Sequence, residues 1–142
     1  MTIAAILDKR SGDVITVGRE TPVREAVALL SERKIGAVPV TDDGAVVGIM
    51  SERDVMLCLA RDGAAVLDAP VGDIMTAPAI TVPRNERVLS ALSLMSNRRI
   101  RHLPVVEGDR LIGIVSIGDL VKHRLDQIES EAEAMLTYIQ TA

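Results

Sequence analysis

Aromatic side chains are nearly absent from this sequence of 142 residues, which has no Phe, no Trp and one Tyr. A hydrophobic core must therefore be aliphatic, and hydrophobic residues of all types make up 48% of the chain. The scarcity of aromatic rings also removes the stacking platforms on which single-stranded nucleic acid usually binds. A formal net charge of −4 argues further against a nucleic-acid surface, which needs a basic footprint.

Cysteine and long apolar runs are also scarce. Cys58 is the only cysteine, so a disulfide within one chain is excluded. No apolar stretch approaches the roughly 18 residues of a membrane span, and the first eight residues lack the basic start of a signal peptide. Together with a charged fraction of 25%, these absences predict a cytoplasmic globular protein that binds neither membrane nor nucleic acid.

The sequence does contain an internal repeat. Residues 15–56 align with residues 80–121 without a gap, at a constant offset of 65 residues. The identities include residue types that chance similarity between apolar stretches would not hold in register. Identical pairs are Thr16 with Thr81, Arg19 with Arg84, Ile35 with Ile100, Pro39 with Pro104, Gly48 with Gly113, Ser51 with Ser116, and Asp54 with Asp119.

Each repeat predicts the order strand, helix, strand, strand, helix. In the first repeat, Thr21 is the expected N-cap of a helix whose first residue is Pro22, and Ser51 is expected to cap the second helix. The expected elements are a strand at 15–17, a helix from 22, strands at 37–41 and 45–50 around a turn at 42–44, and a helix from 51 to about 61.

The repeat also suggests boundaries along the chain. We predict a first repeat with an N-terminal helix over residues 1–68 and a helical tail over 126–142. The second repeat, preceded by a linker that contains a helical turn, is predicted to occupy residues 69–125.

Four motifs in register resemble those of the cystathionine-β-synthase-type (CBS) domain. They are Ile-Gly-Ala-Val-Pro-Val at 35–40, Ile-Arg-His-Leu-Pro-Val at 100–105, Gly-Ile-Met-Ser-Glu-Arg-Asp at 48–54 and Gly-Ile-Val-Ser-Ile-Gly-Asp at 113–119. The chain therefore resembles a CBS domain pair over nearly all of residues 1–125. The resemblance implies a mixed fold, α/β or α+β, in which tandem β-α-β-β-α repeats pack about a pseudo-twofold axis and a C-terminal helix follows.

The Ser-x-x-Asp pattern at the end of each repeat suits a ribose phosphate. A carboxylate can accept hydrogen bonds from both hydroxyls of a cis-diol, and a serine hydroxyl at a helix N-terminus can hold phosphate oxygens. Ser51 with Asp54, and Ser116 with Asp119, are therefore candidate ribose-phosphate sites. The alternative is purely structural, because Ser at the N-cap and an acid three residues later also form a capping box.

The resemblance implies that adenine binds at the turn before each repeated proline, and that each site joins the two repeats. Alternatively, the prolines merely shape the strands. Thr16, Gly36, Ala37, Val38, Pro39, Ser116 and Asp119 are the candidates for one site. Thr81, Arg101, His102, Leu103, Pro104, Ser51, Arg53 and Asp54 are the candidates for the other. Arg101 and His102 suggest that the second site prefers more highly phosphorylated ligands.

No metal-ligand spacing, catalytic nucleophile motif or glycine-rich phosphate loop occurs in the sequence. We therefore expect a regulatory sensor module, not an enzyme, that needs no cofactor and binds an adenine nucleotide as its ligand. The sequence leaves AMP, ADP, ATP, NAD and S-adenosylmethionine open, and the regulated protein target unnamed. The alternative is a constitutive oligomeric scaffold or interaction module with vestigial pockets.

Apolar residues of the tail recur at alternating steps of four and three, which is a heptad seam. Val121, Leu125, Ile128, Ala132, Met135 and Ile139 form this seam, and Glu129, Glu131 and Glu133 stay largely off it. The seam predicts a homodimer. An alternative of equal weight is that the tail helix packs on its own module.

Overall fold

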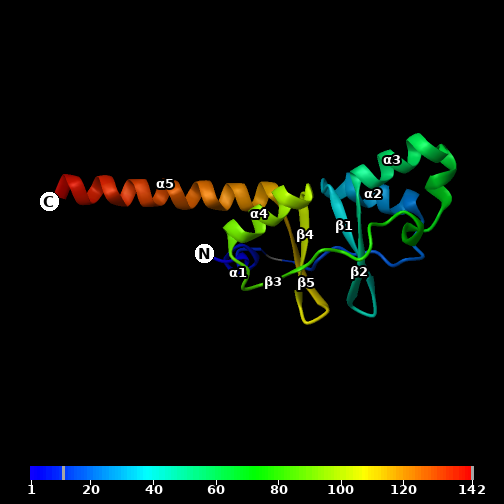
Figure 1. The fold of residues 1–142 in the computed structure, drawn as a ribbon, viewed down its shortest axis with the longest axis horizontal. Coiled ribbons are helices and arrows are strands. Elements are labelled where there is room, and N and C mark those ends of the chain that lie inside the picture. The colour runs from blue at the N-terminus through cyan, green and yellow to red at the C-terminus, as the bar shows by residue number, and fades with distance from the viewer. Residues whose placement is uncertain (11, 142) are drawn as a thin grey trace. The chain divides into compact units, whose positions relative to one another are not determined.

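The computed structural model describes residues 1–10 and 12–141 (Figure 1). The helices are α1 (Ile3–Leu7), α2 (Val23–Arg33), α3 (Glu52–Asp62), α4 (Val88–Arg98) and α5 (Ile117–Thr141), with 3-10 helices η1 (Ala64–Asp68) and η2 (Val71–Asp73). The strands are β1 (Ala37–Asp42), β2 (Ala45–Ser51), β3 (Val82–Pro83), β4 (His102–Glu107) and β5 (Arg110–Ser116). This order confirms the mixed α/β fold and the helical turn in the linker.

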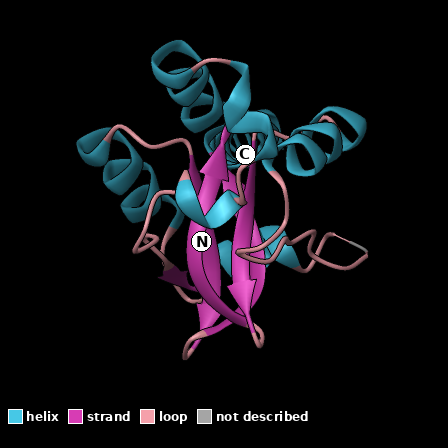
Figure 2. Ribbon diagram, turned by 90° about the vertical axis from the view of Figure 1, so that its right-hand side faces the viewer, coloured by secondary structure: helices cyan, strands magenta, loops and turns pink. Residues whose placement is uncertain are grey.

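The strands form one sheet in the order β1-β2-β5-β4-β3, drawn as magenta arrows in Figure 2. β1 and β2 are antiparallel, and the turn between them has positive φ angles at Asp43 (50°) and Gly44 (82°). An Asp-Gly pair with two positive φ angles matches the twist of a two-residue hairpin. β3 pairs in parallel with β4 through Val82 and Val105.

The described residues divide into two compact units, each with its own aliphatic core. Unit 1 comprises residues 1–10, 84–103 and 115–141, and unit 2 comprises residues 12–83 and 104–114. The core of unit 2 consists of Val17, Val23, Ala26, Leu30, Val38, Val40, Met50, Val55 and Val71. In unit 1 the buried residues include Ile3, Ile6, Val88, Ala91, Met95, Leu103, Val115 and Leu120.

Burial follows the 65-residue offset. Eight buried residues of the first repeat have buried partners at the matching positions of the second, so the repeat holds in three dimensions as well as in sequence. The buried pairs are Val17 with Val82, Val23 with Val88, Ala26 with Ala91, Leu30 with Met95, Val38 with Leu103, Val40 with Val105, Met50 with Val115, and Val55 with Leu120.

Two local expectations in the first repeat were wrong. The helix begins at Val23, because Pro22 has an extended backbone and the N–H of Val23 donates to the carbonyl of Ala69. Thr21 is therefore no N-cap, and its hydroxyl oxygen accepts from the N–H of Gly18 (3.2 Å). The segment expected as a strand at 15–17 is reduced to one isolated bridge, between Val17 and Val40.

Gly48 lies where β2 meets the segment after η2. Ile49 and Thr76 exchange two backbone hydrogen bonds (3.0 and 2.9 Å), which hold that segment against the strand. A Cβ atom placed on Gly48 would lie 2.6 Å from the sulfur of Met75 and 2.9 Å from the carbonyl oxygen of Thr76. The repeated glycine is therefore required in the first repeat by close approach of another backbone.

Gly48→Ala should lower the free energy of unfolding by about 1–3 kcal/mol, because the Thr76 carbonyl must shift to admit a methyl group. Urea denaturation measures the loss. Gly18→Ala is the matched control, since a Cβ there meets nothing within 4 Å. Equal stability of the two variants would contradict the steric account.

Candidate functional site

In the first repeat, β2 ends at Ser51 and α3 begins at the next residue. The Ser51 hydroxyl oxygen accepts from the N–H of Asp54 (3.2 Å), and the Asp54 carboxylate accepts from the N–H of Ser51 (2.8 Å). The Ser51 hydroxyl also donates to the same carboxylate oxygen (3.0 Å). This reciprocal pair is a capping box, so the structural alternative for these two residues is present.

The capping box leaves part of the Asp54 carboxylate for a ligand. Thr76 donates its hydroxyl to the second carboxylate oxygen (3.0 Å). A carboxylate has about four acceptor positions, and the bonds from Ser51 and Thr76 use three of them among the described residues. Capping and ribose binding are therefore compatible at Asp54.

The second repeat has the same reciprocal bonds at the start of α5. The Asp119 carboxylate accepts from the N–H of Ser116 (2.8 Å), and the Ser116 hydroxyl oxygen accepts from the N–H of Asp119 (3.1 Å). Asp119 also forms an ion pair with Arg10, which follows α1 in unit 1. The two carboxylates thus differ in the partner that lies outside the capping box. Asp54 accepts from the neutral hydroxyl of Thr76, whereas Asp119 contacts the guanidinium of Arg10.

Competing effects set the pKa of Asp119. Burial is the largest of them and raises the pKa, because it disfavours the charged form. The backbone hydrogen bond from Ser116 and the hydrogen bond and charge of Arg10 act in the opposite direction and prevail. The pKa of Asp119 therefore lies below its ordinary value of 3.8, and the carboxylate is ionised at neutral pH.

The turn before each repeated proline lies beside the helix start of its own repeat. The carbonyl of Gly36 accepts from the N–H of Glu52, the first residue of α3 (3.0 Å). In the second repeat, the carbonyl of Arg101 accepts from the N–H of Ile117, the first residue of α5 (2.8 Å). In both repeats, one backbone hydrogen bond therefore joins the predicted adenine turn to the helix that carries the acid of the same repeat.

Each candidate threonine precedes a residue that pairs with the strand of the repeated proline in its own repeat. The N–H of Val17, the residue after Thr16, donates to the carbonyl of Pro39 (3.1 Å). Val82, the residue after Thr81, pairs with Val105 in the parallel register of β3 and β4, which sets Thr81 beside Pro104. Both threonines are exposed, so their hydroxyls are accessible to a ligand.

The remaining candidates divide by burial. Val38 and Leu103 are fully buried in the cores, and Ala37 is 3% exposed. These residues can offer a ligand little more than their backbone. Arg53 and Arg101 are exposed and His102 is half-buried, which suits side chains that reach for phosphate.

Sequence reasoning missed Thr76 and Arg10, which contact the two carboxylates. Both lie outside the segments that align most clearly, 22 residues after Asp54 and far before Asp119. The 65-residue offset pairs Arg10 with Met75 and Ser11 with Thr76. Extending the alignment upstream to residues 10 and 11 would have identified them and their partners, residues 75 and 76, as equivalent positions near the Ser-x-x-Asp motifs. Ser11 itself lies outside the described residues.

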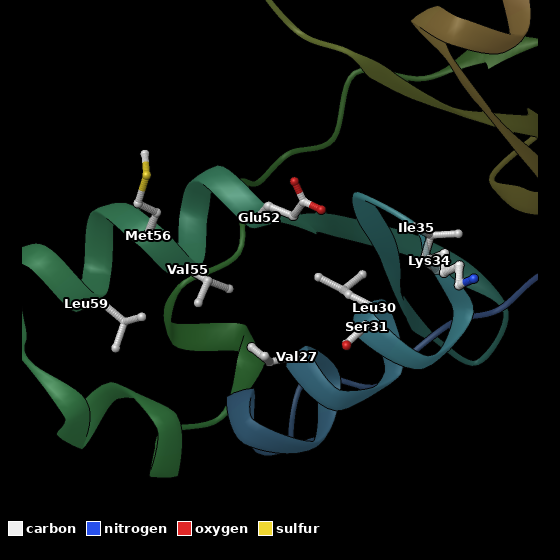
Figure 3. A pocket seen from close by; sticks show the side chains of 9 residues that line it. All are labelled: Val27, Leu30, Ser31, Lys34, Ile35, Glu52, Val55, Met56 and Leu59. Carbon is white, nitrogen blue, oxygen red and sulfur yellow. The ribbon is translucent and has the colours of Figure 1, made fainter.

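A separate apolar groove of about 640 Å³ lies in unit 2, between α2 and α3 (Figure 3). It contains none of the predicted nucleotide-binding residues. Its lining consists of Val27, Leu30, Ser31, Lys34, Ile35, Glu52, Val55, Met56 and Leu59. Met56 is 61% exposed at its edge, and six of the nine lining residues are apolar.

Within residues 1–10 and 12–141, no helix is long and apolar enough to cross a membrane. No group of three or more His, Cys, Asp and Glu residues in the same ranges is placed to hold a metal ion.

Two copies of one α/β repeat, each ending in a capped helix that carries an acid, define a tandem-repeat module. The CBS domain family matches residues 4–61 and 71–126, and the chain belongs to this family. The CBS domain-containing protein YhcV of Bacillus subtilis is 30% identical over 94% of both chains. Part of an enzyme also matches: the chain is 31% identical over 87% of its length to inosine-5'-monophosphate dehydrogenase of Thermoplasma acidophilum, of which it spans 24%.

Solved structures agree with this assignment. A CBS-domain protein of Agrobacterium tumefaciens is 42% identical, with a TM-score of 0.83 over 87% of this chain and 99% of that one. CBSX2 in complex with AMP is 30% identical, with a TM-score of 0.77 over 90% and 98%. The CBS pair of MJ0100 with 5'-methylthioadenosine and S-adenosylmethionine is 28% identical, with a TM-score of 0.76 over 86% and 96%.

The ion pair at Asp119 should make stability depend on pH. A carboxyl whose pKa is lower in the folded state stabilises the fold above its unfolded pKa, and this contribution is lost as pH falls through the folded value. Arg10→Gln should therefore cost about 0.2–1 kcal/mol near neutral pH, as expected of a partly exposed ion pair. Its difference from the wild type should shrink below about pH 4, as Asp119 is protonated.

Urea denaturation of both proteins between about pH 6 and about pH 3 measures this difference. Arg24→Gln is the control, because it breaks a more exposed ion pair with Asp68. A difference between Arg10→Gln and wild type that stays constant over the whole pH range would show that Arg10 does not act through Asp119.

Proposed function

We propose that the chain is a regulatory module that binds adenine nucleotides and has no catalytic activity of its own. The observation that carries the proposal is the same in both repeats. In each repeat an acid is anchored by its own serine at a helix start, and the first N–H of that helix donates to the turn before the repeated proline, so the two repeats supply two acids and two turns for the two proposed sites. Relatives of the same fold that were solved with AMP or with S-adenosylmethionine support an adenine compound as the ligand.

In this proposal each site joins the two repeats. Thr16, Ala37 and Pro39 serve with Ser116 and Asp119, whereas Thr81, Arg101, His102 and Pro104 serve with Ser51, Arg53 and Asp54. The acid accepts the ribose hydroxyls, the backbone before the proline accommodates adenine, and the cations receive phosphate. Arg10 adds a cation near Asp119, so the charge difference between the sites is smaller than the sequence alone indicates.

Binding between repeats would favour one relative orientation of them, and a partner protein that recognises this orientation would receive the signal. We propose that the module works as a homodimer in the cytoplasm, a reducing compartment in keeping with the unpaired thiol of Cys58. The second candidate function is a constitutive scaffold without ligand. The apolar groove between α2 and α3 favours it, because such a surface suits a protein partner.

AMP or ATP at millimolar concentration should raise the melting temperature of the wild type. The rise should grow with the logarithm of ligand concentration above the dissociation constant. The Asp54→Ala/Asp119→Ala double variant should show no rise. Each loss of a cap itself costs about 1 kcal/mol, so the ligand-induced shift is compared with each variant's own unliganded value.

Asp126→Ala, at an exposed position of α5, is the control and should respond like the wild type. If no adenine compound shifts the melting temperature of the wild type, the sensor proposal fails and the scaffold remains.

The pairing of repeats predicts which variants affect the same site. In a two-site calorimetric titration, Asp54→Ala should weaken one binding event by about 1–3 kcal/mol, because ribose hydroxyls lose their acceptor. Arg101→Ala should weaken that same event, and more for ATP than for AMP, because a guanidinium binds phosphate oxygens directly. Asp119→Ala should weaken the other event. If Arg101→Ala and Asp119→Ala instead weaken the same event, each site is built within one repeat.

A further inference from the structure

The last helix carries an apolar face that its own unit leaves uncovered. α5 runs without interruption from Ile117 to Thr141 and extends past α4 and α1 of the same unit (Figure 1). Every described residue from 129 onward is exposed. The heptad seam lies open over its whole length, with Leu125, Met135 and Ile139 exposed by 60%, 62% and 63%.

The seam is not the face by which α5 packs on its own unit. α5 contacts α4 and α1, and its inward face is marked by the fully buried Leu120 and the half-buried His123, Arg124 and Gln127. Each residue of an α-helix turns by about 100° from the one before. The seam therefore lies on the flank next to the inward face, and the described residues of the chain do not cover it.

Charges beside the seam change sign along the helix. Lys122 and Arg124 flank its first half, and Glu129 and Glu131 flank its second half. In a parallel, in-register pair of such helices, Arg124 of each copy lies opposite Glu129 of the other, which gives two ion pairs across one seam. Arg124 donates to Gln127 on the inward face of its own helix (3.0 Å), so the ion pair requires its guanidinium to turn from Gln127 toward the seam.

Antiparallel pairing satisfies the same residues less well. Full antiparallel overlap centres the pair near residue 130, which sets Glu129 and Glu131 opposite their own copies. If the antiparallel helices are shifted until the basic residues of one lie opposite the acidic residues of the other, Ile139 lies beyond the start of the other helix. Met135 then lies opposite Gly118, so part of the seam has no apolar partner. Only the parallel pair covers the whole seam and joins opposite charges.

We propose that α5 of two copies forms a parallel, in-register coiled coil, so that the partner on this face is a second copy of the chain. This inference rests on the homodimer proposed above and adds the orientation and register of its two helices. It does not depend on nucleotide binding. Both modules would then lie at the same end of the coiled coil. A twofold axis parallel to the coiled coil would relate their proposed nucleotide sites.

Disulfide trapping tests the orientation. In a Cys58→Ala background, Ile139→Cys should form a covalent dimer on mild oxidation, because the two thiols face each other at the end of a parallel seam. A mixture of Val121→Cys and Ile139→Cys chains should yield no 121–139 link, as judged by mass spectrometry of the linked peptides. A predominant 121–139 link would overturn the parallel arrangement.

Sedimentation of substituted full-length chains tests the surface. Met135→Glu should raise the dissociation constant of the dimer by roughly tenfold or more, because it buries an unpaired carboxylate. Ala134→Glu, an exposed neighbour off the seam, should not. A wild type that stays monomeric overturns both the homodimer and the coiled coil. A dimer unaffected by Met135→Glu overturns only the coiled coil.

Charge reversal gives an independent readout of register. Arg124→Glu and Glu129→Arg should each weaken self-association, because like charges then meet twice across the seam. Mixing the two variants should restore the dimer as a heterodimer in which both pairs are opposite in charge. Failure of the mixture to associate more tightly than either variant alone would contradict the proposed pairing of Arg124 with Glu129.

Discussion

The structure depends on the way in which an acid closes the start of a helix at the end of a strand. Ser51 with Asp54, and Ser116 with Asp119, satisfy backbone N–H groups that would otherwise lack partners at those helix ends. The residue after each serine, Glu52 or Ile117, donates its N–H to the turn before the repeated proline. Strand, turn and helix are thereby fixed to one another, and the capping bonds also fix the position of the carboxylate that we propose as the ribose acceptor.

Much of this arrangement can be predicted from the repeat. The 65-residue offset identifies equivalent positions, and aliphatic periodicity selects those that are buried, such as Val38 with Leu103 and Val55 with Leu120. The hairpin turn and the Ser-x-x-Asp caps are local, so a short stretch of sequence contains all of their partners. The helix start after Thr21 was mispredicted because the linker carbonyl of Ala69, distant in sequence, takes the place of a side-chain cap.

The candidate site likewise shows that contacts between residues distant in sequence could not be predicted. The acids and their serines are adjacent in the chain and were found, whereas Thr76 and Arg10 reach them through tertiary contacts that no local pattern encodes. These contacts also distinguish the repeats. Asp119 faces a guanidinium that a ligand would have to share or displace, whereas Asp54 faces a hydroxyl. Near-identical motifs therefore have different electrostatic surroundings at Asp54 and Asp119.

A structure of the chain determined with AMP tests the central claim most directly. The account predicts electron density for the nucleotide with its ribose hydroxyls within hydrogen-bonding distance of the carboxylate of Asp54 or Asp119, and its base against the backbone before Pro39 or Pro104. AMP bound elsewhere, such as in the groove between α2 and α3, or Asp54 and Asp119 both without a ribose contact at saturating AMP, would contradict it.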